Sequence, residues 1–184
     1  MHIEVERDRL RRNHILELLY QRYPYPSSDE TLTETLRDRP DLAATRNNIR
    51  SDLDYFLDRG WVMLAGDEHI QMTTLTANGV DVVELTESYR EIAQQNRLLR
   101  LRALMVLAYA GHQPVSEALL VAPLKRERDL DVTSDSVHRA LCYLSQRGLC
   151  RQLDRQLVKI SADGVDYLDG YSEDRAGVAR PAKL

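Results

Sequence analysis

Apolar residues recur at helical spacing along several segments of the chain, and each segment is bounded by proline, glycine or short polar residues. In the first segment, residues 7–23, Leu10, Ile15 and Leu19 follow this spacing, and Pro24 comes next. This pattern predicts an amphipathic helix that ends at the proline, because proline cannot continue a helix.

The rest of the first half predicts two more helices, two strands and a final short helix. Gly60 stands where a helix commonly ends in a left-handed residue, and residues 66–68 have the composition of a turn. The third helix is expected to bury one face, made of Ile49, Leu53, Phe56 and Leu57. The predicted elements are a helix after Ser27–Glu30, a helix from Thr45 to Gly60, strands at 61–64 and 70–75, and a helix capped by Thr76.

The second half repeats this pattern. Residues 48–60 align without gaps on residues 136–148, and residues 76–81 align on residues 161–166. The shift is 88 residues in the first block and 85 in the second, and a hairpin tip between the blocks can absorb the change. Order and spacing agree, so we infer that one unit has been duplicated.

The second copy predicts the same elements in the same order. Three helices followed by a two-stranded hairpin are typical of the winged helix-turn-helix. We therefore expect a mainly α protein with small β-hairpin wings (α+β). Its expected parts are a winged-helix domain at 1–88, a second at 89–171 that starts with a connecting helix, and a flexible tail at 172–184. The connection is either one long helix or two helices, with a break favoured in the polar run 86–91.

Three segments of the second copy carry a resemblance: Val137–Gly148, Ile160–Asp166 and Gly177–Pro181. On these residues, 96–181 resembles a family of small winged-helix proteins of Mu-like bacteriophages and prophages. Members of that family have one such unit, and their function is not established. The resemblance implies a fold and a phage or prophage setting. The present chain departs from it by carrying two units.

Composition places the chain among ordinary globular proteins, with 43% hydrophobic and 29% charged residues. Residues 1–92 hold 11 arginines, no lysine and 18 acidic residues, whereas residues 93–184 hold 14 basic and 11 acidic residues. No apolar run approaches the roughly 20 residues of a membrane span, and no signal peptide is recognisable at the N-terminus. We expect a cytoplasmic protein of a bacterial host, with no membrane partner.

The start of the third helix in the first copy is the most DNA-like stretch. Arginine pairs with guanine, asparagine with adenine, and threonine with phosphate. Alternatively, the threonine is an N-cap and the other side chains form a solvated face. Three aspartates, Asp52, Asp54 and Asp58, continue the helix and would repel phosphate if they faced it. The candidate DNA-binding residues are Thr45, Arg46, Asn47, Asn48 and Arg50.

In the second copy the equivalent residues are less cationic. They serve either for base contact or as helix caps, and the hairpin 151–159 is basic enough to hold a DNA backbone. The loop 125–128 and the arginines Arg97, Arg100 and Arg102 are either phosphate contacts or ordinary surface charge. The candidates here are Ser134, Ser136, His138, Arg139, Arg151 and Arg155.

The sequence contains no recognisable catalytic, metal-binding or cofactor motif. The five histidines are scattered, Cys142 and Cys150 lack the paired spacing of a zinc site, and phosphate-binding glycine motifs are missing. We therefore expect no catalytic residues, no metal and no cofactor, and a protein that is not an enzyme.

Two functions remain open. The first is a non-enzymatic protein that binds double-stranded DNA, a phage or bacterial regulator or DNA-transaction factor, with adjacent half-sites covered by two units or by a homodimer. The alternative is a protein–protein interaction or dimerisation adaptor built on winged-helix domains, favoured by the acidic first half and only three lysines. A positive strip across both third helices would favour DNA, and an apolar groove would favour a protein partner.

Overall fold

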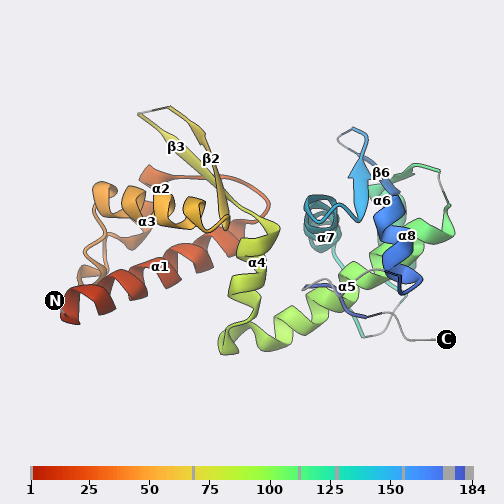
Figure 1. Cartoon of the computed structure of the whole chain (residues 1–184), viewed down its shortest axis with the longest axis horizontal. Helices are drawn as coiled ribbons and strands as arrows, with labels where there is room; N and C mark the ends of the chain where they lie inside the picture. The colour runs from red at the N-terminus through yellow and green to blue at the C-terminus, as the bar shows by residue number, and fades with distance from the viewer. Residues whose placement is uncertain are drawn as a thin grey trace. The chain divides into compact units, whose positions relative to one another are not determined.

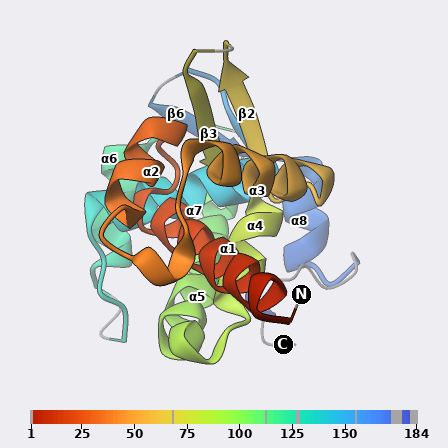
Figure 2. The same ribbon diagram turned by 90° about the vertical axis from the view of Figure 1, so that its left-hand side faces the viewer.

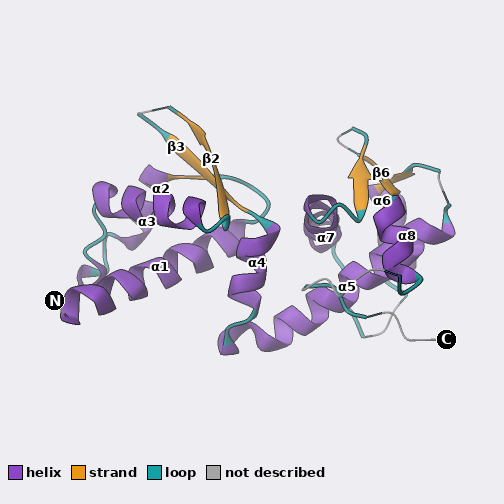
Figure 3. Cartoon of the chain, viewed as in Figure 1, coloured by secondary structure: helices purple, strands orange, loops and turns teal. Residues whose placement is uncertain are grey.

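The computed structural model describes residues 2–67, 69–111, 113–126, 129–154, 156–171 and 177–180. These residues form eight α-helices and two small three-stranded antiparallel sheets (Figures 1 and 3). The mainly α composition with small β hairpins is therefore confirmed. The chain divides into two compact units, Met1–Val83 and Glu84–Leu184, slightly before the expected boundary at residue 88.

In the first unit, α1 (His2–Arg22), α2 (Asp29–Leu36) and α3 (Arg46–Asp58) lie at the base of the hairpin formed by β2 (Val62–Gly66) and β3 (Gln71–Leu75) (Figures 1 and 2). The predicted face of α3 is confirmed in part: Ile49, Leu53 and Phe56 are fully buried, but Leu57 is 45% exposed. The elements are α1 (His2–Arg22), β1 (Ser27–Ser28), α2 (Asp29–Leu36), the 3₁₀ turn η1 (Pro40–Leu42), α3 (Arg46–Asp58), β2 (Val62–Gly66), β3 (Gln71–Leu75) and α4 (Ala77–Glu84).

The second unit repeats this order. Its first helix begins at Arg90, and the break before it lies in the polar run 86–91, as predicted. The elements are η2 (Glu87–Tyr89), α5 (Arg90–Tyr109), β4 (Val115–Ser116), α6 (Glu117–Leu124), α7 (Ser134–Gln146), β5 (Cys150–Gln152), β6 (Leu157–Ile160) and α8 (Ala162–Leu168).

Each sheet contains a short strand that the sequence did not predict. β1 pairs with β3 through Ser27 and Thr73, and β4 pairs with β6 through Val115 and Val158. The strand orders are β1-β3-β2 and β4-β6-β5. A strand of two residues has no alternation of its own, so no periodicity could reveal it.

The repeated sequence motifs make the same contacts in both units. A Cβ on Gly79 would lie 2.2 Å from the Trp61 carbonyl oxygen, and one on Gly164 would lie 2.1 Å from that of Leu149. The Thr76 hydroxyl donates to Gly60 in the first unit, as Ser161 does to the equivalent glycine in the second. Close helix–hairpin packing therefore explains why glycine and a hydroxyl residue recur.

Residues 177–180, which we expected in a flexible tail, lie instead against α5. Val178 is 6% exposed, and the Ala179 amide donates to the Arg97 carbonyl at 3.1 Å. The Tyr167 hydroxyl, on α8, also donates to the Val178 carbonyl. The other tail residues, 172–176 and 181–184, lie outside the described part of the chain.

Candidate nucleic-acid interface

Two of the candidate residues at the start of α3 build the helix terminus. The Thr45 hydroxyl accepts from the Asn48 amide at 3.3 Å, so its interpretation as an N-cap is confirmed. The Asn48 side chain donates to the Ala43 carbonyl at 2.8 Å. Asn47 is exposed on the surface of the helix. Of these three side chains, Asn47 is the one that faces solvent without a structural hydrogen bond among the described residues.

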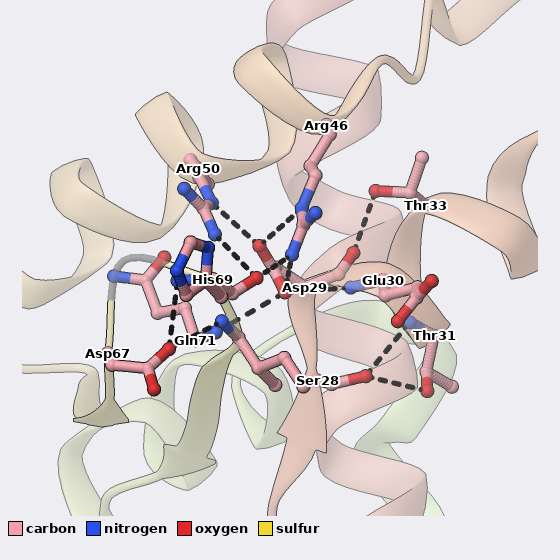
Figure 4. Close-up of polar contacts among 11 residues, drawn as sticks. Ser28, Asp29, Glu30, Thr31, Thr33, Arg46, Arg50, Asp67, His69 and Gln71 are labelled. Atoms are coloured by element: carbon pink, nitrogen blue, oxygen red, sulfur yellow. Dashed lines mark hydrogen bonds and ion pairs between the residues drawn. The ribbon is translucent and has the colours of Figure 1, made fainter.

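The two arginines of this stretch converge on Asp29, the first residue of α2 (Figure 4). The Nε atoms of Arg46 and Arg50 lie 2.9 and 2.6 Å from Oδ2 of Asp29, a residue with no exposed surface. Both guanidinium groups also donate to the His69 carbonyl in the hairpin turn, and the Gln71 amide donates to Oδ1 of Asp29 at 3.3 Å. The Asp29 carboxylate thus links α2 to α3 and to the hairpin.

The ionisation of Asp29 follows from these contacts. Burial alone raises its pKa, but hydrogen bonds from Arg46 and Arg50 and from the Gln71 amide outweigh burial and lower the pKa from 3.8 to about 2. The carboxylate is therefore charged throughout the neutral range. The sequence predicted Asp29 only as part of the segment 27–30 before the second helix, and its pairing with both arginines was not predicted.

Arg46 and Arg50 thus have structural partners, which the sequence analysis did not foresee. Their side chains remain 43% and 32% exposed. A phosphate approaching them would meet a positive pair already balanced in part by Asp29. Their role in DNA contact stays a prediction.

The three aspartates of α3 do not act alike. Asp52 is 1% exposed and accepts from Nε of Arg11 at 2.6 Å and from Nε of Arg12 at 2.8 Å. It therefore belongs to an internal ion pair and does not present a charge to a ligand. Asp54 and Asp58 are exposed, as the repulsion argument assumed.

A hollow of about 490 Å³ lies between α3 and the hairpin of the first unit, lined by Arg50, Asp54, Gly66, Asp67 and Gln71. Backbone N–H groups of Ile70 and His69 donate to Asp67 and lower the pKa of its carboxyl. Two carboxylates and one guanidinium that is already paired make this hollow unfavourable for phosphate.

In the second unit, the polar start of α7 is largely occupied by local contacts. Thr133 and Ser136 form a capping box, with reciprocal bonds of 2.9 and 3.0 Å. Nε of Arg139 lies 3.0 Å from Asp135, one helical turn earlier. Ser134 is exposed. The capping interpretation is therefore confirmed for Ser136.

His138 occupies the position equivalent to Arg50, and Glu117 the position equivalent to Asp29. Nδ1 of His138 lies 3.0 Å from Oε2 of Glu117, so the acid–base pair at the start of the second helix recurs with different residues. Nε2 of the same ring lies 3.6 Å from Sγ of Cys142. The interpretation of the five histidines as scattered, with none four residues from a cysteine, was therefore wrong for His138, because Cys142 has this spacing.

The hairpin of the second unit carries two cations side by side. Arg151 on β5 and Lys159 on β6 are directly opposed in the antiparallel register, and Arg151 is exposed. Within the described residues neither side chain has an ion-pair or hydrogen-bond partner. The candidate Arg155 lies outside the described residues.

The arginines of α5 also differ in availability. Arg100 is 4% exposed and forms two bonds of 2.7 and 2.8 Å with Glu84, so it is a core residue and not a surface charge. Arg97 and Arg102 are half-buried, and Lys125 and Arg126 are exposed. Residues 127 and 128 of the predicted basic loop lie outside the described part.

Comparisons of the chain with models of protein families, with curated proteins and with solved structures give no match. Across the described residues, no helix combines the length and apolarity needed to cross a bilayer. The same residues contain no cluster of three or more histidine, cysteine or acidic side chains arranged to hold a metal ion.

Proposed function

We propose that this chain is a non-enzymatic phage or bacterial protein that binds double-stranded DNA through two winged helix-turn-helix units. The order of helices and strands in each unit supports this proposal, since a helix pair with an adjoining hairpin is the common plan of such domains. The resemblance of residues 96–181 to small phage proteins suggests the winged-helix plan and the phage setting of the proposal, not DNA binding itself.

The observation that carries the proposal is the opposed pair Arg151 and Lys159 in the β5–β6 hairpin. Like charges directly opposite each other destabilise a sheet. Phosphate groups of a DNA backbone, one at each cation, would remove this repulsion and release counterions. The second unit, which is also the more basic half of the sequence, is therefore proposed to make the main backbone contacts.

The experiment is a fluorescence-anisotropy titration of the full chain with mixed-sequence duplex DNA at several salt concentrations. The variant Arg151→Ala/Lys159→Ala should bind more weakly, and the slope of log K against log salt should fall by roughly 2, because about 0.9 counterion is released for each phosphate contact. Arg9→Ala/Arg22→Ala removes the same charge from exposed positions on α1. Equal effects of the two double variants would show that binding depends only on the net charge of the chain, and would refute a site on the hairpin.

A protein-interaction adaptor is the second candidate, and the hollow lined by Asp54 and Asp67 favours it. This hollow suits a basic segment of a partner better than a phosphate. If the wild-type chain does not bind DNA even at low salt, Asp54→Lys/Asp67→Lys should be compared with wild type for binding of a lysine-rich peptide. Binding that survives this double reversal of charge would count against the adaptor.

A further inference from the structure

Three side chains of the second unit stand in line. Glu117 begins α6, and His138 and Cys142 lie one turn apart on α7. The Glu117 carboxylate is 3.0 Å from Nδ1 of His138, and Nε2 is 3.6 Å from the Cys142 sulfur. The imidazole therefore bridges an acid and a thiol.

This arrangement favours one tautomer of the histidine. A carboxylate only accepts, so Nδ1 of His138 carries the proton and donates it to Glu117. The lone pair of Nε2 then faces the Cys142 thiol, which is the arrangement of a base ready to take the thiol proton. Glu117 orients the ring and stabilises the imidazolium that would form.

The surroundings keep the resting thiol protonated. Burial raises the pKa of Cys142; Glu117 raises it further, and a weak hydrogen bond from the Gln152 amide, 3.8 Å away on β5, opposes the rise. Burial likewise raises the pKa of Cys150 to about 12. Such a thiol carries little thiolate at neutral pH and reacts slowly unless a base takes its proton. Cys142 is partly exposed, whereas Cys150 is 2% exposed.

The first unit lacks this chemistry at the equivalent positions. There the acid is Asp29, the base is replaced by Arg50, and the thiol is replaced by Asp54. Both units thus have an acid at the start of the second helix of the unit. In the second unit this acid is joined by a base, His138, and a nucleophile, Cys142.

We propose that Cys142 is a covalent modification site for soft carbon electrophiles of the α,β-unsaturated carbonyl class, with His138 as its general base and Glu117 as the positioning residue. Nε2 of His138 accepts the thiol proton while the sulfur forms a bond to the β-carbon of the electrophile. The π electrons of the double bond move to the α-carbon, which then takes the proton back from the imidazolium. The addition needs no other reactant.

The test is the rate at which the full chain is alkylated by N-ethylmaleimide between pH 5.5 and 8.5, with the labelled cysteine located by peptide mass spectrometry. In the wild type, Cys142 should label before Cys150, and its rate should level off as the pH rises, because the imidazole and not hydroxide removes the thiol proton. In His138→Gln, labelling at pH 7 should be about tenfold slower or more and should rise roughly tenfold per pH unit, because only the thiolate then reacts.

Glu117→Gln should give an intermediate rate, with the plateau displaced in pH. The other groups near the thiol, Gln152 and Cys150 on β5, do not titrate in this range. Labelling in 8 M urea should be equal for all variants, which corrects for differences in folding. Identical pH profiles for wild type and His138→Gln, or preferential labelling of Cys150, would overturn the proposal. If His138→Gln does not fold, the wild type is sufficient for the test: a labelling rate that rises tenfold per pH unit without a plateau would overturn the proposal.

Discussion

Arg100 lies over the ring of Tyr143, with its guanidinium carbon 3.8 Å from the ring centroid. In the first unit Arg12 lies over Tyr55 in the same way, at 4.2 Å. Each arginine and each tyrosine is separated from its counterpart by 88 residues. A cation on a tyrosine ring is therefore part of the repeated core, which explains why tyrosine recurs at this position of the two aligned segments.

The acid that neutralises the stacked arginine differs between units, and this gives the first prediction. Glu84 is fully buried against Arg100, so Glu84→Gln leaves a buried guanidinium without its carboxylate. We expect a loss of about 3–5 kcal/mol in the free energy of unfolding, measured by urea denaturation followed by circular dichroism. Glu87→Gln breaks a pair whose side chains are 73% and 78% exposed, and it should change the same quantity by less than about 1 kcal/mol.

The second prediction concerns acid stability of the first unit. The folded pKa of Asp29 is about 2 against an ordinary 3.8, so the unfolded chain binds more protons between these values. The stabilisation is complete above about pH 4 and is lost as the pH falls through about 2. Trp61 is the only tryptophan, so its fluorescence follows the first unit. The free energy of unfolding, measured in urea, should fall by about 2 kcal/mol as the pH falls across this window. The variant Asp29→Asn should lack that part of the pH dependence. An unchanged pH profile in Asp29→Asn would contradict the assignment.

The third prediction uses the two tight glycines. Alanine normally stabilises a helix relative to glycine by about 0.5–1 kcal/mol, but Gly79→Ala would force a Cβ against the Trp61 carbonyl. We expect a loss of about 1–3 kcal/mol in the first unit, seen in the tryptophan transition. Gly164→Ala is the matched control, since it should destabilise the second unit and leave tryptophan unfolding unchanged. A stabilising effect of Gly79→Ala would show that the helix and hairpin can separate at no cost.

The fourth prediction separates structural from DNA-binding roles of Arg46. Because this residue is bonded to Asp29 and to the hairpin turn, Arg46→Ala should lower the free energy of unfolding of the first unit. On the DNA-binding proposal, its effect on affinity for duplex DNA should be smaller than that of Arg151→Ala. The two are compared by anisotropy at a temperature where both variants are folded. A larger loss for Arg46→Ala would place the main contact on α3 of the first unit.

Local patterns predicted the helices and hairpins well because those elements have regular periods and strong end signals. The third helices illustrate this, since Thr45 and Gly60 mark the ends of α3 in sequence and in structure. Local patterns could not predict the strand at Ser27–Ser28, which exists only through pairing with β3.

The partners of charged residues were the least predictable part of the candidate site. Arg46 lies 17 residues from Asp29, and Arg11 lies 41 residues from Asp52, so neither pair has a local spacing signal. Such pairs depend on how helices cross, which the sequence period does not specify. The His138–Cys142 pair is different, because a separation of four on a helix is readable in advance.

The contact between Gly177 and α5 bears on the order in which the protein is made. The Gly177 carbonyl accepts from Arg100, 77 residues earlier, at 2.8 Å. During synthesis the first unit has all its residues once Val83 has left the ribosome. The second unit must wait for residues 177–180, and until then the Arg100 guanidinium lacks one of its acceptors. A fragment designed to end at Tyr171, where the repeat ends, would stay in that unfinished state.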